Sequence, residues 1–358
     1  MQPVEIKDGI VLFKGRISGN LLLEPMSSNI YLLEDGDEVI IFDASCGREI
    51  AKRIETHIQS RHEAKVGWKR AFLIAGHSHS DHANNFYLST VLAAPDTHIY
   101  VHESGFQDGK VKNEPVPFAE NAIEESRKYY NPYLAFPVPY NLLMYPLMAL
   151  NALSPVLARK VFGIVSGIPW PAPVNGPIEP EPLREDDIQV VNLEDYVVRG
   201  WRVGSKVILP TPGHSTCSVS LFWLERKALF ISDADWIGDP VYASSSLRDS
   251  ISSLEKLKAL TEAGKVELLL PAHGQVKEGR DQIVSYLDFH IRRLEVIRNE
   301  VLSAYLSCGE EKDVRKLTKV LAQKSPLFRM LKLVNYPRLM FFVHNVVAVC
   351  LREQGIFD

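Results

Sequence analysis

The pattern of apolar and polar positions in the first third of the chain alternates strand signals with one helix signal. Residues 29–42 form two β-rich runs around the turn residues 34–37, which predicts a β-hairpin. Isoleucines at spacings of four then predict a helix over 48–62. The short apolar run 70–75 predicts a buried strand, and 97–103 predicts a further one. We therefore expect a sheet flanked by helix in this part of the chain.

Strand patterns return in the second half of the chain and give way to a helical end. A hairpin is predicted around residues 225–227, a helix over 252–264 and a strand over 265–274. Before that hairpin, strand patterns cover 188–193, 205–210 and 218–224. From Gly279 onward, leucine, isoleucine and valine recur at spacings of three and four, which is typical of helices. Strand-rich parts before and after the middle of the chain suggest a duplicated sandwich.

An apolar stretch separates the two strand-rich parts. Residues 131–158 carry no charged side chain, which is long enough to suggest a membrane-spanning helix. Five prolines within it would remove backbone donors that lipid cannot replace, so we expect no transmembrane span. The stretch belongs to an insertion at about 104–186. Its apolar part, 131–175, suits a lid or an apolar substrate arm, and a homodimer contact or a plain core extension are the alternatives.

Length, charge and cysteine content narrow the class of protein. A chain of 358 residues suits one or two domains, and its net charge of about −4 gives no argument for a polyanionic partner. The first residues lack the basic start and apolar run of a secretion signal, which predicts a cytoplasmic protein. The four cysteines form no CxxC pair and are interpreted as mostly buried, reduced thiols. They are Cys46, Cys217, Cys308 and Cys350.

The densest group of polar residues follows the predicted strand 70–75. The stretch reads AGHSHSDHAN and contains His77, His79, Asp81 and His82. Imidazole nitrogen and carboxylate oxygen are ligands that zinc and similar divalent metals prefer. The spacing does not match one face of a helix, and the end of a strand is where an open α/β sheet places its ligands. This pattern predicts a metal site, with a solvated histidine-rich loop as the alternative.

Three later residues occupy the same kind of position. His214 lies in a turn between two predicted strands, Asp233 directly follows a strand, and His273 follows another. Taken singly, a loop histidine is more often hydrogen-bonded to backbone and a loop aspartate is more often a cap. Their shared position at strand ends favours one common site.

With these motifs together, the sequence resembles the metallo-β-lactamase superfamily. The motifs are HSHSDH, TPGH, LFISDA and PAHG, in that order, after a first hairpin that ends in Asp43. The resemblance covers roughly residues 4–103 and 187–290. It implies an α+β fold, a four-layer αβ/βα sandwich with an apolar insertion and a helical C-terminal tail. The catalytic domain would span 1–280, and the tail 281–358.

The resemblance also implies a ligand set. His77, His79 and His214 would bind one metal, Asp81, His82 and His273 a second, and Asp233 would bridge them. Asp43 would hold a ligand in place. Two positions depart from the family pattern, because Ser232 and Asn84 stand where glycine is usual; Asp235 is interpreted as a cap or a supporting acid.

By this resemblance the protein would be a dinuclear metal-dependent hydrolase. Two divalent metal ions, zinc first and iron or manganese as alternatives, would activate a bridging hydroxide, with Asp81 and Asp233 holding or passing the proton. The expected substrate is a small-molecule thioester, ester or lactone with an apolar acyl arm. A metal-dependent ribonuclease or other phosphodiesterase, and a mononuclear iron persulfide dioxygenase, remain as alternatives.

The start of the helical tail carries a further resemblance. His290, Arg293 and Ile297 are similar to a helix in superfamily members with a small winged-helix-like tail. Between residues 292 and 338 basic residues exceed acidic ones. This excess is typical of a nucleic-acid contact, and a solvated helix face with the same composition is the alternative.

Overall fold

The chain builds two seven-stranded sheets, each in nearly sequential strand order. The computed structural model describes residues 2–15, 27–45, 48–107, 109–111, 154, 178–193, 195–236, 240, 244–335 and 340–356. The first sheet has the order β1-β2-β3-β4-β5-β6-β9. Its strands are β1 (Val4–Lys7), β2 (Ile10–Phe13), β3 (Ile30–Asp35), β4 (Glu38–Phe42), β5 (Arg70–Ile74), β6 (Asp96–His102) and β9 (Glu181–Leu183). Strands β4, β5, β6 and β9 are parallel, so their carboxyl ends share one edge.

The second sheet follows the order β10-β11-β12-β13-β14-β15-β16. Its strands are β10 (Gln189–Leu193), β11 (Tyr196–Val203), β12 (Lys206–Pro210), β13 (Val219–Trp223), β14 (Ala228–Ser232), β15 (Leu268–Pro271) and β16 (Lys277–Glu278). Strands β14 and β15 are parallel, and the other pairs are antiparallel. Both faces of β13 and β14 are buried, which explains their continuous apolar sequences.

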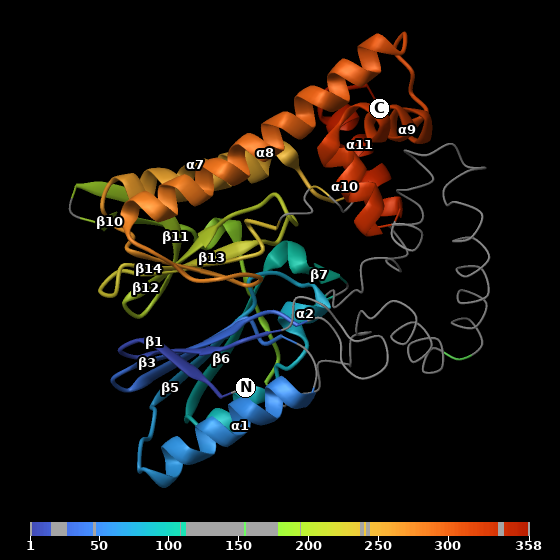
Figure 1. Cartoon of the computed structure of the whole chain (residues 1–358). Helices are drawn as coiled ribbons and strands as arrows, with labels where there is room; N and C mark the ends of the chain where they lie inside the picture. The colour runs from blue at the N-terminus through green and yellow to red at the C-terminus, as the bar shows by residue number, and fades with distance from the viewer. Residues whose placement is uncertain are drawn as a thin grey trace.

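Helices cover the outer face of each sheet (Figure 1). The first sheet carries α1 (Arg48–Glu63), α2 (Ser80–Ala83) and α3 (Leu88–Leu92). The second sheet carries α7 (Leu247–Glu262) and the long α8 (Arg280–Ser307), and α9 (Val314–Lys324), α10 (Pro326–Asn335) and α11 (Met340–Glu353) follow. A two-stranded ribbon, β7 (Phe106–Gln107) with β8 (Lys110–Val111), lies within the predicted insertion at about 104–186, and so does β9 of the first sheet.

Three apolar cores separate these layers. One core lies between the sheets and includes Trp223 and Phe230. A second lies between the first sheet and its helices and includes Ile54 of α1. The third lies under the helices of the second sheet and includes Leu254 of α7 and Leu287 of α8. Three cores between four layers make an αβ/βα sandwich, so the predicted fold class is confirmed.

Most strand and helix predictions agree with the structure, but strand β11 was not predicted, and α7 begins at Leu247 instead of the predicted residue 252. Both predicted hairpins form, as β3–β4 and β13–β14, and α1 spans one residue more than predicted. The tail consists of four helices in its described part, and its relation to a winged helix stays a prediction. The apolar stretch 131–175 lies outside the described residues, apart from Ser154, and so does Cys46. Of the three described cysteines, Cys217 and Cys350 are buried and Cys308 is exposed, all three unpaired.

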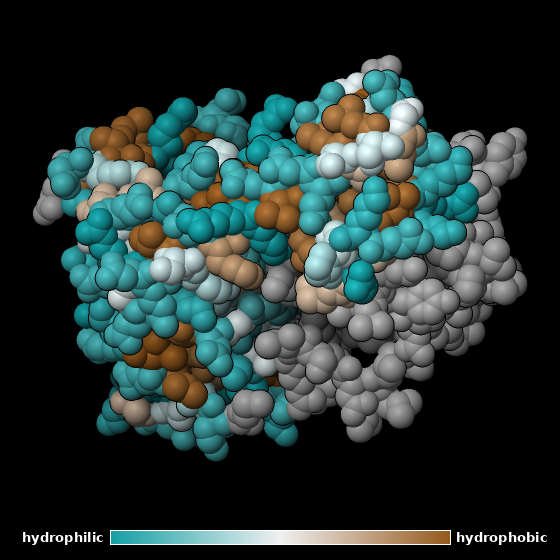
Figure 2. All heavy atoms as spheres, turned by 45° about the horizontal axis from the view of Figure 1, so that its top comes forward, coloured by the Kyte–Doolittle hydropathy of each residue, from teal (hydrophilic) through white to brown (hydrophobic). Residues whose placement is uncertain are grey.

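Figure 2 shows the side of the molecule on which α7 and α8 lie. The coloured part of this surface is mostly hydrophilic, with several separate hydrophobic areas. On α8, Phe289 and Val296 are each about half exposed. No helix in the described part of the chain is both long and apolar enough to cross a membrane.

A buried lysine links the two sheets at the end opposite the carboxyl ends of β4 and β12. Lys206 of β12 is fully buried, and its Nζ contacts the carboxylates of Asp35 and Glu38 in the first sheet. Removing a charge without a partner from water costs several kcal/mol, so the ammonium depends on these acids.

We expect Asp35→Asn with Glu38→Gln to destabilise the protein by about 3–5 kcal/mol, because Lys206 would then be buried without a counter-ion. Adding Lys206→Met should recover most of that loss, since the buried ammonium would be gone. The free energy of unfolding in urea measures both effects. A triple variant as unstable as the double variant would contradict this explanation.

Candidate metal centre

The seven residues predicted as ligands all lie at the carboxyl ends of strands. His77 and His79 follow β5, and Asp81 and His82 lie on the short helix α2 directly after them. His214 lies in the loop between β12 and β13, Asp233 follows β14, and His273 follows β15. The structure brings all seven together where the two sheets meet.

Three histidines form a first group. The Nε2 atom of His77 lies 2.8 Å from Nδ1 of His79, and Nε2 of His214 lies 3.1 Å from the same Nδ1. His77 and His214 are buried and His79 is partly exposed. The three ligand atoms lie within 4.8 Å of one another, close enough to hold one metal ion.

Asp81, His82 and His273 form a second group with the same spacing. The Oδ2 atom of Asp81 lies 3.3 Å from Nε2 of His273 and 3.6 Å from Nε2 of His82. The Asp81 side chain is 15% exposed, more than those of the two histidines, so this group opens to solvent on the side of Asp81.

Asp233 lies between the two groups. Its Oδ2 atom is 3.5 Å from Nε2 of His214 and 3.3 Å from Nε2 of His82, while its Oδ1 atom is 3.5 Å from Nε2 of His273. One carboxylate therefore faces donor atoms from both groups. This is the arrangement that a bridging ligand requires.

The donor atoms of this centre include buried polar atoms without hydrogen bonds. Nε2 of His82, Nε2 of His273 and Oδ1 of Asp233 are inaccessible to solvent and have no hydrogen-bond partner. A buried polar atom without a partner costs about 1–3 kcal/mol. A divalent cation would satisfy all three atoms at once, and their nitrogen and oxygen chemistry suits zinc, so the residues fit a metal centre.

The surroundings of His79 and Asp81 lower the pKa values of both groups. Burial first, and then the positive charge of His214, lowers the pKa of His79 to about 3. Burial would raise the pKa of Asp81, but the imidazoles of His82 and His273 lower it to about 2. Asp81 is therefore ionised and His79 neutral at neutral pH, which are the forms that bind metal.

Asp43 supports the centre from behind. Its Oδ1 accepts a hydrogen bond of 2.7 Å from the backbone N–H of Gly76, and its Oδ2 lies 3.0 Å from Nδ1 of His82. The backbone of Asp43 is left-handed, with φ of +60°, which is strained for a residue other than glycine. Such strain persists where the surroundings over-determine it. Asp43 therefore contacts His82, one of the candidate ligands.

Ser232 contributes a hydroxyl that its sequence position did not reveal. It is buried, its φ is +47°, and its Oγ donates a 3.0 Å hydrogen bond to Oδ2 of Asp43. The same Oγ lies 3.3 Å from Nδ1 of both His77 and His82, one histidine from each group. A glycine here would accommodate the left-handed backbone, but it would lack this hydroxyl.

Gly76 is required because of Ser232. A Cβ at position 76 would lie 2.1 Å from the Ser232 Oγ and 2.7 Å from an Asp43 oxygen, which no side chain could tolerate. The second departure from the family pattern has less effect, since Asn84 has an ordinary φ of −91° that needs no glycine.

Asp235 lies two residues after Asp233 and is hydrogen-bonded from helix α8. It is buried and accepts a hydrogen bond from Tyr286 of α8, and burial is the main cause that raises its pKa to about 7. On the same helix, Arg293 donates to the backbone carbonyl of Trp236 at 2.9 Å. Helix α8 therefore holds the segment after Asp233, which explains why Arg293 is buried.

Comparisons with known proteins agree with this architecture. The model of the metallo-beta-lactamase superfamily matches residues 23–273. No curated protein sequence matches the chain. Among solved structures, the chain is similar in fold to a metallo-beta-lactamase family protein from Thermus thermophilus, at 18% identity and a TM-score of 0.56 over 98% of this chain and 95% of that one.

Two further structures are similar in fold. A beta-lactamase domain protein from Burkholderia ambifaria has 14% identity and a TM-score of 0.53, with 99% of this chain and 88% of that one covered. A stereoselective inverting sec-alkylsulfatase from a Pseudomonas species has 13% identity and a TM-score of 0.54, with 100% of this chain and 51% of that one covered. The chain thus spans about half the length of the sulfatase.

Proposed function

The chain belongs to the metallo-beta-lactamase superfamily of metal-dependent hydrolases, and from that premise we propose that it holds two divalent metal ions and cleaves a thioester, ester or lactone. The observation that carries this proposal is the position of Asp233, whose two oxygens lie within 3.5 Å of imidazole nitrogens from both groups. A carboxylate in that position serves a pair of ions better than a single one.

Each proposed metal has its own three ligands besides Asp233. His77, His79 and His214 would hold the first, and Asp81, His82 and His273 the second. The donor set of imidazoles and carboxylates suits zinc, and iron and manganese accept the same ligands. Bound at this centre, the ions would supply an activated water and a positive charge for the oxygen on which negative charge develops.

The protein's own contribution is to position groups and to move a proton. Asp81 is the most exposed carboxylate of the centre and is ionised at neutral pH, so it can hold the proton of the attacking water by accepting its hydrogen bond until the leaving group takes that proton. Asp233, more deeply buried, is held in place by the imidazoles around it. A serine or cysteine nucleophile is not required, and Cys217 is engaged at 3.4 Å by the backbone N–H of Ser78.

The substrate class follows from the proposed hydrolytic chemistry. In HSHSDH, His79 adds an imidazole beside His77, and such ligands suit zinc, the metal proposed first for hydrolysis. An acyl thioester, ester or lactone presents a carbonyl carbon to attack and a leaving group that needs one proton.

The test is a substrate panel on protein of measured metal content. Purified protein would be assayed with acyl thioesters, esters, lactones, phosphodiesters and an RNA oligomer, before and after removal of metal by a chelator. We expect acyl cleavage that is lost with the metal and returns when zinc is added, at about two zinc ions per chain. Cleavage of RNA alone would favour the phosphodiesterase alternative. One iron per chain with persulfide oxidation would favour the dioxygenase, and full activity without metal would overturn the proposal.

Ser232 gives a more local prediction. Because its hydroxyl contacts Nδ1 of His77 and His82, it favours the tautomers whose Nε2 atoms are free to bind metal. We expect Ser232→Ala and Ser232→Gly each to weaken metal binding by roughly tenfold. Competition with a coloured chelator measures the affinity.

The two Ser232 variants also separate strain from hydrogen bonding. Only Ser232→Gly relieves the left-handed backbone, so it should unfold at a higher temperature than Ser232→Ala in metal-free protein. Ser220→Ala is the control, since Ser220 is an equally buried serine that bonds Thr211 instead. Unchanged metal affinity in both Ser232 variants would contradict the role of the hydroxyl.

A further inference from the structure

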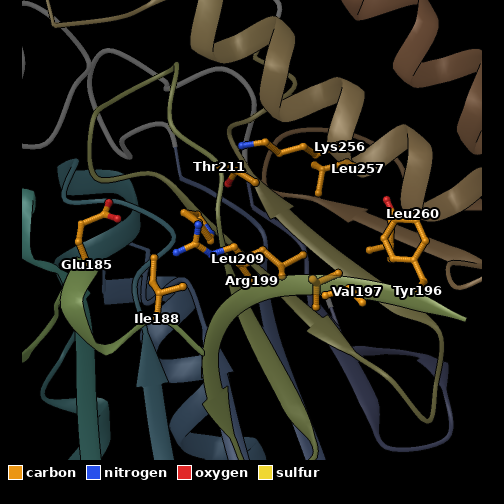
Figure 3. Close-up of a pocket in the computed structure, with 12 residues that line it drawn as sticks. Glu185, Ile188, Tyr196, Val197, Arg199, Leu209, Thr211, Lys256, Leu257 and Leu260 are labelled. Atoms are coloured by element: carbon orange, nitrogen blue, oxygen red, sulfur yellow. The ribbon is translucent and has the colours of Figure 1, made fainter. Parts of the chain in front are cut away.

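A pocket separate from the metal centre opens between the second sheet and α7 (Figure 3). Its volume is about 350 Å³, within the range of small-molecule sites. It is lined by residues of β11, the end of β12, α7 and the segment before β10. None of the seven predicted metal ligands lines it.

The two ends of the pocket differ in character. At one end, Tyr196 and Val197 of β11 give the pocket exposed apolar surface, beside the buried Leu260 of α7 (Figure 3). Lys256 of α7 and Arg199 of β11 point away from Tyr196, toward the other end, where the Lys256 ammonium lies beside Thr211 (Figure 3). An apolar chamber with two cations at one end matches a ligand that has an alkyl tail and an anionic head.

The two cations have no ion-pair partner among the described residues, although neighbouring lysines do. Lys258, two residues along α7, pairs with Asp288 at 2.6 Å, and Lys265 pairs with Asp195 at 2.5 Å. The acid that lines the pocket is Glu185, and its carboxylate lies 3.3 Å from the His102 imidazole. The positive charge of Arg199 and Lys256 is therefore available to a ligand.

The pocket adjoins the loop that carries His214. Ser253 of α7 donates a 2.7 Å hydrogen bond to the Pro212 carbonyl, and Gly213 packs against Ser250 of the same helix. Lys256, Leu257 and Leu260 follow on the next turns of α7. A ligand in the pocket would contact the helix that supports this loop.

We propose that this pocket binds an amphipathic monocarboxylate, a medium-chain alkyl carboxylate. The carboxylate pairs with Arg199 and Lys256, and the alkyl tail lies against the exposed apolar surface of Tyr196 and Val197. Guanidinium and ammonium groups hold carboxylates through charge-assisted hydrogen bonds, and the tail gains from burial of apolar surface. The inference does not depend on the proposed hydrolysis, because the pocket lies outside the metal centre.

Calorimetric titration of the full-length protein with straight-chain carboxylates tests the proposal. From butanoate to octanoate we expect affinity to rise roughly three- to fourfold per added methylene, because each methylene is buried against the apolar surface of Tyr196 and Val197. Octylammonium has the same tail and the opposite charge, so it should bind at least about tenfold more weakly than octanoate.

Variants locate the site. Arg199→Gln with Lys256→Gln should weaken octanoate binding at least about tenfold and leave the unfolding temperature nearly unchanged, since both side chains are exposed. Arg202→Gln is the matched control, because Arg202 is an exposed arginine of the same strand that does not line the pocket. Octanoate binding that is insensitive to the double variant, or equal binding of octylammonium, would overturn the proposal, as would tighter binding of octyl phosphate than of octanoate.

Discussion

Replacing Asp233 by asparagine is expected to reduce metal-dependent hydrolysis by more than about 100-fold and to leave the purified protein with less than two metal ions per chain. Asparagine keeps the shape of the side chain and removes its negative charge. That charge faces Nε2 of His82 at 3.3 Å and Nε2 of His214 at 3.5 Å, one from each group. A neutral amide cannot bridge two cations, so the loss should exceed that of any ligand belonging to one group.

Elemental analysis and activity, measured on the same preparation, check this prediction. Asp187→Asn is a suitable control, because Asp187 is an exposed acid far from the ligand atoms in sequence and lies in a short helical turn. Normal metal content with normal activity in Asp233→Asn would show that this carboxylate does not bridge a metal pair.

The second large effect is expected at Asp43. Its carboxylate accepts hydrogen bonds from the Gly76 N–H and the Ser232 hydroxyl, and it contacts Nδ1 of His82. In Asp43→Asn, the amide NH₂ would face an N–H or O–H group that now donates to the carboxylate, so one hydrogen bond would be lost. We expect metal affinity to fall by about 10- to 100-fold and the metal-free protein to lose about 1–3 kcal/mol of unfolding free energy.

Asp43→Gly separates the two functions of this residue. Glycine relieves the strain of φ at +60° and removes the carboxylate, so metal-free stability should suffer less than in Asp43→Asn while metal affinity stays low. Chelator competition and urea unfolding give the two quantities independently. Wild-type metal affinity in Asp43→Gly would mean that the carboxylate does not orient His82.

Much of the fold could be predicted because apolar periodicity depends on local sequence. The sequence predicted the β3–β4 hairpin, helix α1 and the strands before His77 and His273. Each of these elements buries one or both of its faces, so its apolar residues recur in a regular pattern. The tail after Gly279 was predicted as helical for the same reason. The insertion was predicted only as an apolar stretch.

The candidate ligands were predictable because each follows a strand. When parallel strands end at one edge of a sheet, residues distant in sequence meet there, as His77 and Asp233 do. Their grouping was given by the resemblance, and the structure brings the same residues within 4.8 Å in each group of three.

Other contacts had no signal in the sequence. Ser232 looked like a departure from the family pattern that altered the backbone, but it lies against Asp43 and two histidines. Asp235 carried no sign of Tyr286, which lies 51 positions further along the chain. The buried Lys206 and the pocket around Arg199 likewise involve residues from separate elements.

The sequence by itself thus determined most of the segments that become strands and helices and which strand ends carry imidazoles and carboxylates. These features depend on the order of residues within a few positions of one another. The tertiary structure alone decided that the Ser232 hydroxyl faces two histidines and that Lys206 is buried. It also decided that Arg199 and Lys256 line the same pocket. Such pairings depend on how side chains from distant segments pack, and a linear pattern does not contain the distances between them.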